Sequence, residues 1–344
     1  MVKQGKISVQ APSNIAFVKY WGKTGRQHPI NPSISMTLKH CLTTCSISYR
    51  TEAEDTRVES FRFSGEENEK FKARIEKYLN DISDVVPALQ NLSLSIETDN
   101  TFPHSAGIAS SASAFAAIGY ALAHIEHDLG FADNGDIETR ASTLARLGSG
   151  SAGRSVVGPY NMWGEYAPEN STDDYAVKVT DIHEEFNHVK DAILLIDAGE
   201  KKVSSSAGHK LMDNHPYRQA RIDQAIDHTK RMIDAMRTGD WDTFGEILEN
   251  DALALHTLMM TSSPSFILLA PNSLEAIERI RDYRKQTGLP VYFTIDAGPN
   301  IHLIYPKKHE DVVEKFIADQ LKNLCQNGKY IIDECGKGAC VIKS

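Results

Sequence analysis

The sequence contains few cysteines, five in 344 residues. Cys41 and Cys45 lie four positions apart, but no second cluster of Cys or His follows that would complete a zinc site. An odd number of cysteines, and an N-terminus without the apolar segment of a secretory signal, favour free thiols in a reducing, cytoplasmic compartment. No disulfide framework is expected, and a chain of this length can instead bury a sizeable hydrophobic core.

Long apolar runs and an excess of basic residues are also lacking. The most apolar stretch, residues 106–125, is mostly alanine and holds three serines, two glycines and a histidine, which is too polar for a membrane span. Acidic residues outnumber lysine and arginine by 46 to 37, so no nucleic-acid partner is expected, because such partners require a basic surface. An anionic small molecule remains compatible with this charge where lysines and arginines converge.

The sequence does contain a mixture of two periodicities. Alternating residues predict strands over residues 7–9, 34–38, 45–49, 92–96, 192–197, 291–295 and 301–305. Apolar residues at helical spacing predict helices over residues 66–79, 106–125, 136–147, 215–258 with a break near 239, 272–287 and 310–326. Strands and helices do not alternate strictly, so we predict an α+β fold, with two domains at residues 1–186 and 187–344.

One glycine-rich segment imitates nucleotide-binding motifs. Gly148–Gly153 matches the dinucleotide fingerprint, and Gly148–Ser155 differs from a phosphate-binding P-loop by Arg154 in place of lysine. Both motifs require a preceding strand, whereas residues 142–147 have a helical pattern, so we reject both. Two interpretations remain: the hydroxyls and amides hold an anion together with Arg154, or the segment is a flexible loop.

A second phosphate-binding candidate lies at residues 103–113. A half-buried strand leads into a loop with Gly107, and the helix that follows begins near Ser110 and Ser111. The first amides of a helix lack internal partners and carry partial positive charge, so they attract phosphate, and the two hydroxyls add donors. The alternative is an ordinary N-capped helix.

Two further segments hold charged residues in unusual settings. Lys19 and Lys23 flank two large aromatic residues; if Val18 faces the core, Lys19 needs an anionic partner, and otherwise it is a surface lysine. Asp296 follows an apolar strand in a tight turn, where it either satisfies turn amides or forms a rigid carboxylate in a cleft. No special role is expected for the remaining histidines, which show no metal-binding spacing, among them His104, His209 and His302.

Taken together, these segments resemble one family. The matching segments are Ala11–Lys23, Ser33–Leu38, Gly107–Ser111, Gly148–Ser155, Lys202–Ser205 and Asp296–Asn300. They resemble the diphosphomevalonate decarboxylases of the GHMP kinase superfamily, and the first and last segments are the most specific. The resemblance implies a two-lobed α+β fold with the active site in the cleft between the lobes. It also implies an ATP- and Mg²⁺-dependent decarboxylation of mevalonate 5-diphosphate to isopentenyl diphosphate.

The resemblance further implies roles for individual residues and a homodimeric assembly. Asp296 would orient the 3-hydroxyl of the substrate and accept its proton, and Lys19 would stabilise the charge on Asp296 and on the migrating phosphoryl group. The residues implied in catalysis are Asp296, Lys19 and Arg154. The residues implied in substrate binding are Tyr20, Lys23, Arg74, Ser149, Ser151 and Arg154, and those implied in ATP binding are Gly107, Ala109, Ser110 and Ser111.

Some positions depart from the family pattern. Gly153 stands where cysteine is frequent, Pro159–Asn161 where Gly-Tyr is usual, and His104 at the entry to the ATP loop. These changes affect the shape of the diphosphate pocket, so mevalonate 5-phosphate is an alternative substrate. A superfamily kinase without decarboxylation is another alternative, against which the intact Lys19–Lys23 and Asp296–Asn300 segments argue. A non-catalytic binding protein is a third, and it would be expected to have lost a charged site residue, which this chain has not.

Overall fold

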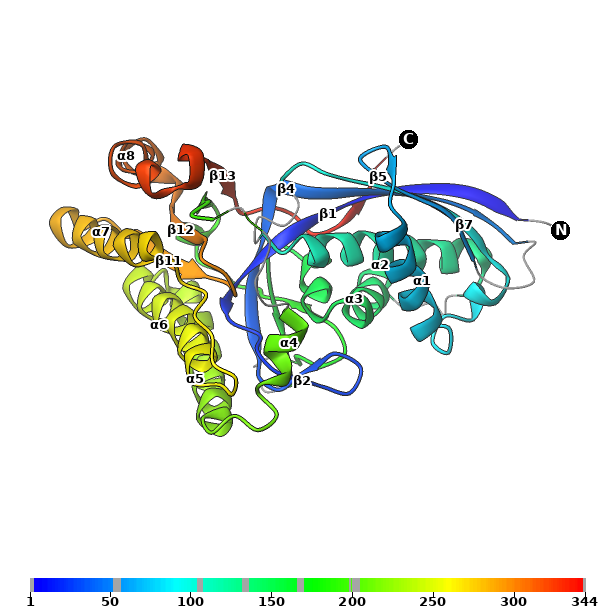
Figure 1. The fold of residues 1–344 in the computed structure, drawn as a ribbon, viewed down its shortest axis with the longest axis horizontal. Coiled ribbons are helices and arrows are strands. Elements are labelled where there is room, and N and C mark those ends of the chain that lie inside the picture. Colours follow the sequence, from blue (N-terminus) through cyan, green and yellow to red (C-terminus); the bar gives the residue numbers. More distant parts are fainter. Residues whose placement is uncertain are drawn as a thin grey trace.

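The computed structural model describes residues 3–51, 57–103, 108–131, 136–165, 170–197, 199 and 205–342. Two lobes lie side by side in Figure 1, each made of one sheet with helices packed against it. Helices and antiparallel strands are mixed in both lobes, so the predicted α+β class is confirmed. Within the described ranges, no helix combines the length and apolar character that a membrane span needs.

The first lobe is built on an eight-stranded sheet. Its strand order is β14-β1-β4-β7-β5-β6, while β8 pairs with β4 and β9 with β8. All pairs are antiparallel except β5 with β7. The strands are β1 (Gln4–Val18), β4 (Ser33–Arg50), β5 (Arg57–Phe63), β6 (Glu66–Glu67), β7 (Ser93–Asn100), β8 (Tyr160–Trp163), β9 (Val177–Lys178) and β14 (Cys340–Val341). A separate short hairpin joins β2 (Lys23–Thr24) and β3 (His28–Pro29).

The strands β1 and β4 are much longer than the alternating pattern predicted. They span 15 and 18 residues and pair in register from Gln4↔Arg50 to Val18↔Ile34, with irregularities near Pro12 and Ala16. Residues 11–18 are all buried, because helices of the first lobe and elements of the second lobe cover both faces of this part of the sheet. A strand that is buried on both faces loses its alternation of polar and apolar residues, so its length cannot be predicted from period two.

Three helices cover one face of this sheet: α1 (Glu69–Asp81), α2 (Ser110–Leu129) and α3 (Ile137–Gly148). Helix α2 is rich in alanine because it packs closely against α3. A Cβ added at Gly119 would lie 2.6 Å from the backbone nitrogen of Ala145. The predicted helix start at residue 106 lies outside the described residues, which place the first turn of α2 at Ser110. Short 3₁₀ turns in this lobe cover Pro87–Asn91 and Gly150–Ser155, and a third at Glu184–Phe186 precedes the second lobe.

The second lobe is a four-stranded antiparallel sheet with helices around it. The strand order is β11-β12-β10-β13, formed by β10 (Val189–Leu194), β11 (Tyr292–Ile295), β12 (Ile301–Pro306) and β13 (Tyr330–Glu334). The helices are α4 (Ser205–Lys210), α5 (Arg218–Thr238), α6 (Trp241–Met260), α7 (Pro271–Thr287) and α8 (Glu310–Phe316). The predicted break near residue 239 is confirmed, because Gly239 ends α5 with a φ of 78° and Asp240 caps α6.

The predicted helix over residues 310–326 is wrong beyond residue 316. After α8 the chain forms a π-helical turn at Ile317–Leu321 and 3₁₀ turns at Lys322–Leu324 and Gln326–Gly328; another 3₁₀ turn, Lys307–His309, precedes α8. Ile317, Leu321 and Leu324 are buried in the core of the second lobe. Their spacing is close to that of an α-helix, so the sequence pattern could not distinguish a regular helix from this succession of turns.

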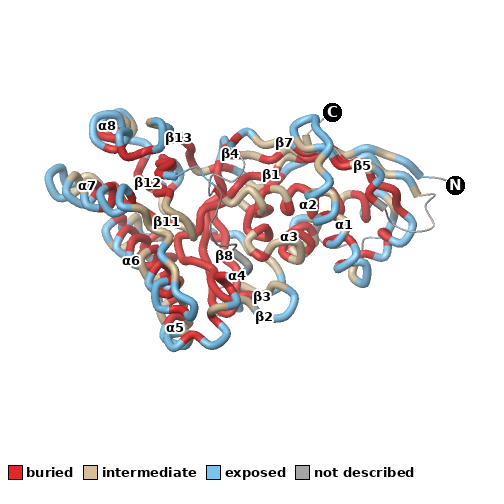
Figure 2. Tube along the Cα trace, viewed as in Figure 1, coloured by how far each residue is buried: buried red, intermediate tan, exposed pale blue. Residues whose placement is uncertain are grey.

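The two lobes share core residues and one strand. Phe17 of β1 contacts Phe244 of α6 edge-on, with ring centroids 5.1 Å apart. The last strand, β14, returns to the first sheet beside β1. Figure 2 shows buried chain running without interruption between the lobes. The long strand β1 therefore ends at the junction of the lobes, which is where Lys19 lies; the domain boundary after residue 186 stays a prediction.

Candidate active site

A cavity of about 670 Å³ lies at this junction. The end of β1, the first turn of α2, the segment after α3, helix α4 and the turn after β11 all contribute to its wall. It brings together nearly all the side chains that the sequence singled out, namely Lys19, Tyr20, Lys23, Arg74, Ala109, Ser110, Ser111, Ser149, Ser151, Arg154 and Asp296. Gly107 lies outside the described residues.

Lys19 and Asp296 form an ion pair at the wall of the cavity. The Lys19 Nζ donates to Oδ1 of Asp296 at 2.7 Å and to the carbonyl oxygen of Ala16 at 2.7 Å. The lysine is 2% exposed and the aspartate 30%. The buried lysine thus has the carboxylate partner that its position after Val18 required, while the carboxylate remains open to a ligand.

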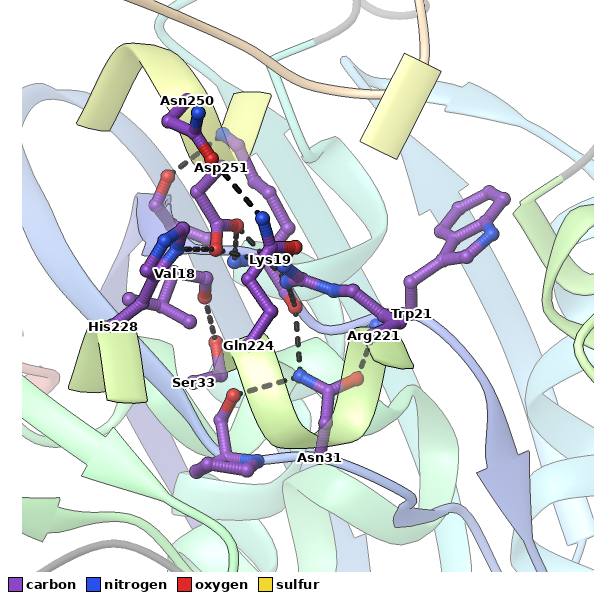
Figure 3. Close-up of polar contacts among 12 residues, drawn as sticks. Val18, Lys19, Trp21, Asn31, Ser33, Arg221, Gln224, His228, Asn250 and Asp251 are labelled. Carbon is purple, nitrogen blue, oxygen red and sulfur yellow. Dashed lines mark hydrogen bonds and ion pairs between the residues drawn. The ribbon is translucent and has the colours of Figure 1, made fainter. Parts of the chain in front are cut away.

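A buried polar cluster behind the cavity fixes the backbone of Lys19 (Figure 3). The Lys19 amide donates to Oδ1 of Asp251 at 2.7 Å, and its carbonyl accepts from Arg221 at 2.8 Å and from Asn31 at 2.9 Å. Arg221 also donates two hydrogen bonds to Asp251, and His228 contacts the second oxygen of that carboxylate at 2.7 Å. Helices α5 and α6 of the second lobe therefore hold the residue that directly follows β1 of the first.

Asp251→Asn should lower the free energy of unfolding by about 3–5 kcal/mol at pH 7, because it leaves the buried Arg221 without its counter-ion. Burial raises the pKa of Asp251, but Arg221 and His228 outweigh it and lower the pKa to about 2. The wild type therefore loses this stability as the pH falls from about 4 towards 2, and its advantage over the variant should shrink.

Urea unfolding of both proteins at pH 7 and at about pH 2.5, close to the folded-state pKa of Asp251, measures this difference. The exposed Asp234 of α5 gives the matched control, since Asp234→Asn should change stability by no more than about 0.5 kcal/mol. If Asp251→Asn were equally harmless, the cluster would not be what holds Lys19.

The turn that carries Asp296 is anchored from two helices. His256 of α6 donates from Nε2 to the carbonyl oxygen of Asp296 at 3.1 Å, and Ser273 of α7 donates to the carbonyl oxygen of Pro299 at 2.7 Å. Burial and the charge of Lys19 lower the pKa of His256 to about 4, so this ring is neutral at physiological pH. The carboxylate of Asp296 is therefore held at a fixed place in the cavity.

Arg154 is buried in the segment that follows α3. Its guanidinium donates to the hydroxyl of Ser33 and lies 5.8 Å from the ring centroid of Tyr20 and 5.9 Å from that of Trp163. Burial lowers the pKa of Arg154 to about 10, opposed by Asp296 and Tyr20, so the group stays charged at neutral pH. The cavity wall therefore carries a rigid cation beside the Lys19–Asp296 pair.

The interpretation of this segment as a flexible loop is wrong. Gly150–Ser155 forms a 3₁₀ turn, and Gly150 and residues 152–155 are buried. Asn161 donates to the carbonyl oxygens of Arg154 and Val157 at 2.7 Å, and Asn14 donates to the Ser155 hydroxyl at 2.7 Å. Gly150 packs against Tyr20, and Ser149 and Ser151 line the cavity.

The first turn of α2 presents free amide donors to the cavity. The residue before the helix, Ala109, has a left-handed backbone with a φ of 42°, and no described side chain caps the helix. Ala109, Ser110 and Ser111 all line the cavity. A 20-residue helix with such an end attracts phosphate, and the two hydroxyls supply the oxygen donors that Mg²⁺ accepts alongside phosphate oxygens and water.

Basic side chains gather at another part of the cavity wall. Lys23 donates to Gln27 at 2.8 Å, and Arg74 lies over the ring of Phe115, 4.9 Å from its centroid. Lys70 reaches the same cavity from α1. Burial lowers the pKa of Lys23, and Lys210 adds to this effect, while burial alone lowers the pKa of Arg74. An anionic group bound here would compensate the buried charge of Arg74 and relieve the repulsion between Lys23 and Lys210.

Sequence reasoning missed several polar residues of the cavity wall, among them Gln27, Lys70 and His209. His209 of α4 was expected to have no special role, yet it lines the cavity and is 7% exposed. No metal spacing or charge pattern marks it. The available signal was its place four residues beyond Ser205, the end of one of the segments with a family resemblance.

The fold and the cavity define a class: a two-lobed enzyme of the GHMP kinase type, with an acid–lysine pair in the wall of the cavity at the junction of the lobes. Two family models match the chain, "Diphosphomevalonate decarboxylase-like N-terminal domain" over residues 11–176 and "Mevalonate 5-diphosphate decarboxylase C-terminal domain" over residues 192–338. The chain therefore belongs to the diphosphomevalonate decarboxylase family.

Individual relatives agree with this assignment. A diphosphomevalonate decarboxylase of Debaryomyces hansenii is 31% identical over 89% of this chain and 81% of that protein. A phosphomevalonate decarboxylase of Haloferax volcanii is 30% identical over 91% and 92% of the two chains. A solved structure of MDDEF in complex with MVAPP, AMPPCP and magnesium is 28% identical, with a TM-score of 0.83 over 99% of this chain and 100% of the other.

Proposed function

We propose that this protein catalyses the ATP-dependent decarboxylation of mevalonate 5-diphosphate to isopentenyl diphosphate, with release of ADP, phosphate and carbon dioxide. The observation that carries the proposal is the contact between Lys19 and Asp296 in a cavity with phosphate-binding groups on two sides. Family membership and the ligands of a related solved structure support it.

In the first step the tertiary 3-hydroxyl of the substrate attacks the γ-phosphorus of ATP. The O3–P bond forms, the bond to the ADP oxygen breaks, and the hydroxyl proton passes to Asp296. Lys19 stabilises both the carboxylate and the migrating phosphoryl group, which makes the aspartate a weaker base. Its fixed position is therefore the larger contribution, because a held acceptor aligns the hydroxyl for transfer.

In the second step the 3-phosphate leaves and carbon dioxide is lost. The C3–O bond breaks and positive charge develops at C3, while the electrons of the C1–C2 bond form the C2=C3 double bond. Asp296 first returns its proton to an oxygen of the 3-phosphate, so the carboxylate is negative again when charge develops at C3 and stabilises it electrostatically. The carboxylate of Asp296 therefore serves both steps. Arg154 lies close enough to Asp296 to interact with its charge, and it can stabilise the phosphate that leaves C3.

The two phosphate-binding parts of the cavity take different partners. The amides and hydroxyls at the start of α2 bind the phosphates of ATP, and Ser110 and Ser111 would hold Mg²⁺, which neutralises charge on the phosphates when bound. Tyr20, Lys23, Arg74, Ser149, Ser151 and Arg154 bind the diphosphate tail of the substrate. Binding energy from this tail orients the reacting carbon.

Product analysis tests the proposal. Purified protein incubated with ATP, Mg²⁺ and mevalonate 5-diphosphate should release ADP and carbon dioxide in equal amounts. ADP without carbon dioxide would identify a kinase and reject the proposal.

Mevalonate 5-phosphate is a second candidate substrate, because a relative of similar identity is a phosphomevalonate decarboxylase. The basic groups at Lys23, Lys70 and Arg74 favour the diphosphate, since a monophosphate would leave part of this charge without a partner. Comparison of kcat/KM for the two substrates decides between them. A higher kcat/KM for the monophosphate would make mevalonate 5-phosphate the substrate, and the decarboxylation mechanism would remain the same.

We also propose a cytoplasmic homodimer. Five cysteines without a disulfide are typical of a reducing compartment, and the family resemblance supports the dimer. Light scattering coupled to size-exclusion chromatography measures the mass, which should be twice that of the 344-residue chain.

A further inference from the structure

His209 occupies an enclosed place in the cavity wall. Its ring lies against Tyr20, with centroids 4.3 Å apart, and against Trp21, with centroids 4.8 Å apart. Both aromatic residues come from the segment after β1, whereas His209 comes from α4 of the second lobe. His209 is 7% exposed, and its exposed part faces the cavity.

The helix that carries His209 is fitted closely to this aromatic pair. A Cβ added at Gly208 would lie 2.5 Å from Cη2 of Trp21, so only glycine allows α4 to approach so near. The contact fixes the neighbouring histidine against the two rings. Packing against the two rings thus holds the imidazole of His209 in one position.

A hydrogen bond determines which ring nitrogen carries the proton. The backbone amide of Gly22 donates to Nδ1 of His209 at 2.9 Å. An acceptor nitrogen has no hydrogen, so a neutral ring must carry its proton on Nε2. No residue in the described part of the chain accepts a hydrogen bond from Nε2, which leaves this donor to the cavity.

The surroundings of His209 keep the ring neutral. Burial is the main cause that lowers its pKa to about 3, and the positive charges of Lys23 and Arg154 lower it further. The ring therefore lies close to Lys23 and Arg154, and both of these residues line the cavity. A neutral N–H donor there can bind an anion without adding a further positive charge beside Lys23 and Arg154.

We propose that His209 is a further substrate-binding residue, whose Nε2–H donates a hydrogen bond to a phosphate oxygen of the substrate tail beside Lys23. This inference rests on the proposed function, since it assumes a substrate with a phosphate tail. It assigns α4 of the second lobe a part in recognising the substrate. His209 itself takes no part in proton transfer, so loss of its donor should affect binding far more than turnover.

Two substitutions test the roles of the two ring nitrogens separately. In His209→Asn the amide oxygen replaces the Nδ1 acceptor for Gly22, but no group reaches the place of Nε2. In His209→Gln the longer amide supplies a donor near Nε2 and loses the Nδ1 acceptor. His209→Asn should raise the KM for mevalonate 5-diphosphate about 10- to 100-fold, with kcat changed less than about threefold. His209→Gln should recover most of the lost affinity.

The matched control is the exposed His127 of α2, where the Asn variant should keep KM within about twofold of the wild type. If His209→Gln were the impaired variant and His209→Asn normal, the ring would serve only to hold Gly22. Equal impairment of both variants would likewise assign it a structural role. Either pattern would overturn the proposal.

Nitrogen-15 NMR of histidine-labelled protein tests the proposal without turnover. The His209 ring should show a protonated Nε2 and an unprotonated Nδ1 from about pH 5.5 to 8.5. Added mevalonate 5-diphosphate should shift the Nε2 resonance. An unmoved resonance in a protein that decarboxylates this substrate would reject the role of His209 alone. A protein that releases no carbon dioxide would instead reject the proposed function, while the state of the ring could still be read.

Discussion

Replacing Asp296 with asparagine should lower kcat for carbon dioxide release by about 10²- to 10⁴-fold, while the Kd for ATP stays nearly unchanged. Asparagine keeps the shape of the side chain and can still accept the hydrogen bond from Lys19. It cannot take the hydroxyl proton, and it provides no negative charge opposite the developing cation at C3. Rapid-quench measurement of both ADP and carbon dioxide shows which step is slowed.

The expected loss of turnover must be distinguished from unfolding of the variant. Asp296→Asn leaves the buried Lys19 without a counter-ion, so melting temperature and circular dichroism should be recorded for each protein. The exposed Asp282 of α7 offers a matched change, and Asp282→Asn should leave turnover unaltered. A folded Asp296→Asn protein with wild-type kcat would place the proton acceptor elsewhere.

Lys19→Met should lower kcat by about 10²- to 10³-fold, because it removes the cation that stabilises the migrating phosphoryl group. Methionine has nearly the length of lysine and fits a buried site without charge. The fold should survive, since Asp251 and Arg221 hold the backbone of residue 19 and the 30% exposed Asp296 can be hydrated. Steady-state kinetics with mevalonate 5-diphosphate give the change in both constants.

The contrasting substitution is Lys23→Met, in the same segment of the chain. Lys23 lines the cavity among the basic groups assigned to the substrate tail, so its loss should raise KM and leave kcat largely intact. Lys19→Met should therefore mainly lower kcat, whereas Lys23→Met should mainly raise KM. If both changed only KM, Lys19 would be a binding residue and would take no part in the chemistry.

The sequence predicted the place of several helices, and it predicted an anionic partner for Lys19 on the condition that Val18 faces the core. A lysine after a buried Val18 must find an anion, and Gly239 and Gly288 end helices as their conformational freedom allows. These predictions succeed because local chemistry determines them. The convergence of Lys19 and Asp296, 277 residues apart, came from family resemblance, since no local pattern specifies a contact at that range.

Other features depend on the tertiary structure and could not be predicted. The full length of β1 is concealed because residues 11–18 are all buried, and that of β4 because residues 33–38 are all buried and Lys39 and His40 are exposed. The 3₁₀ turn at Gly150–Ser155 is ordered by Asn14 and Asn161, which lie outside the segment. The donor role inferred for His209 follows from a hydrogen bond to Gly22, 187 residues away. No periodicity in the sequence reports such a contact.

A crystal structure of the protein with mevalonate 5-diphosphate bound is the most direct test of the roles assigned to Lys19 and Asp296. The 3-hydroxyl should lie within about 3.2 Å of a carboxylate oxygen of Asp296, with the diphosphate on the side of Lys23 and Arg74. A substrate bound in the opposite direction, with its hydroxyl more than about 5 Å from Asp296, would contradict the mechanism.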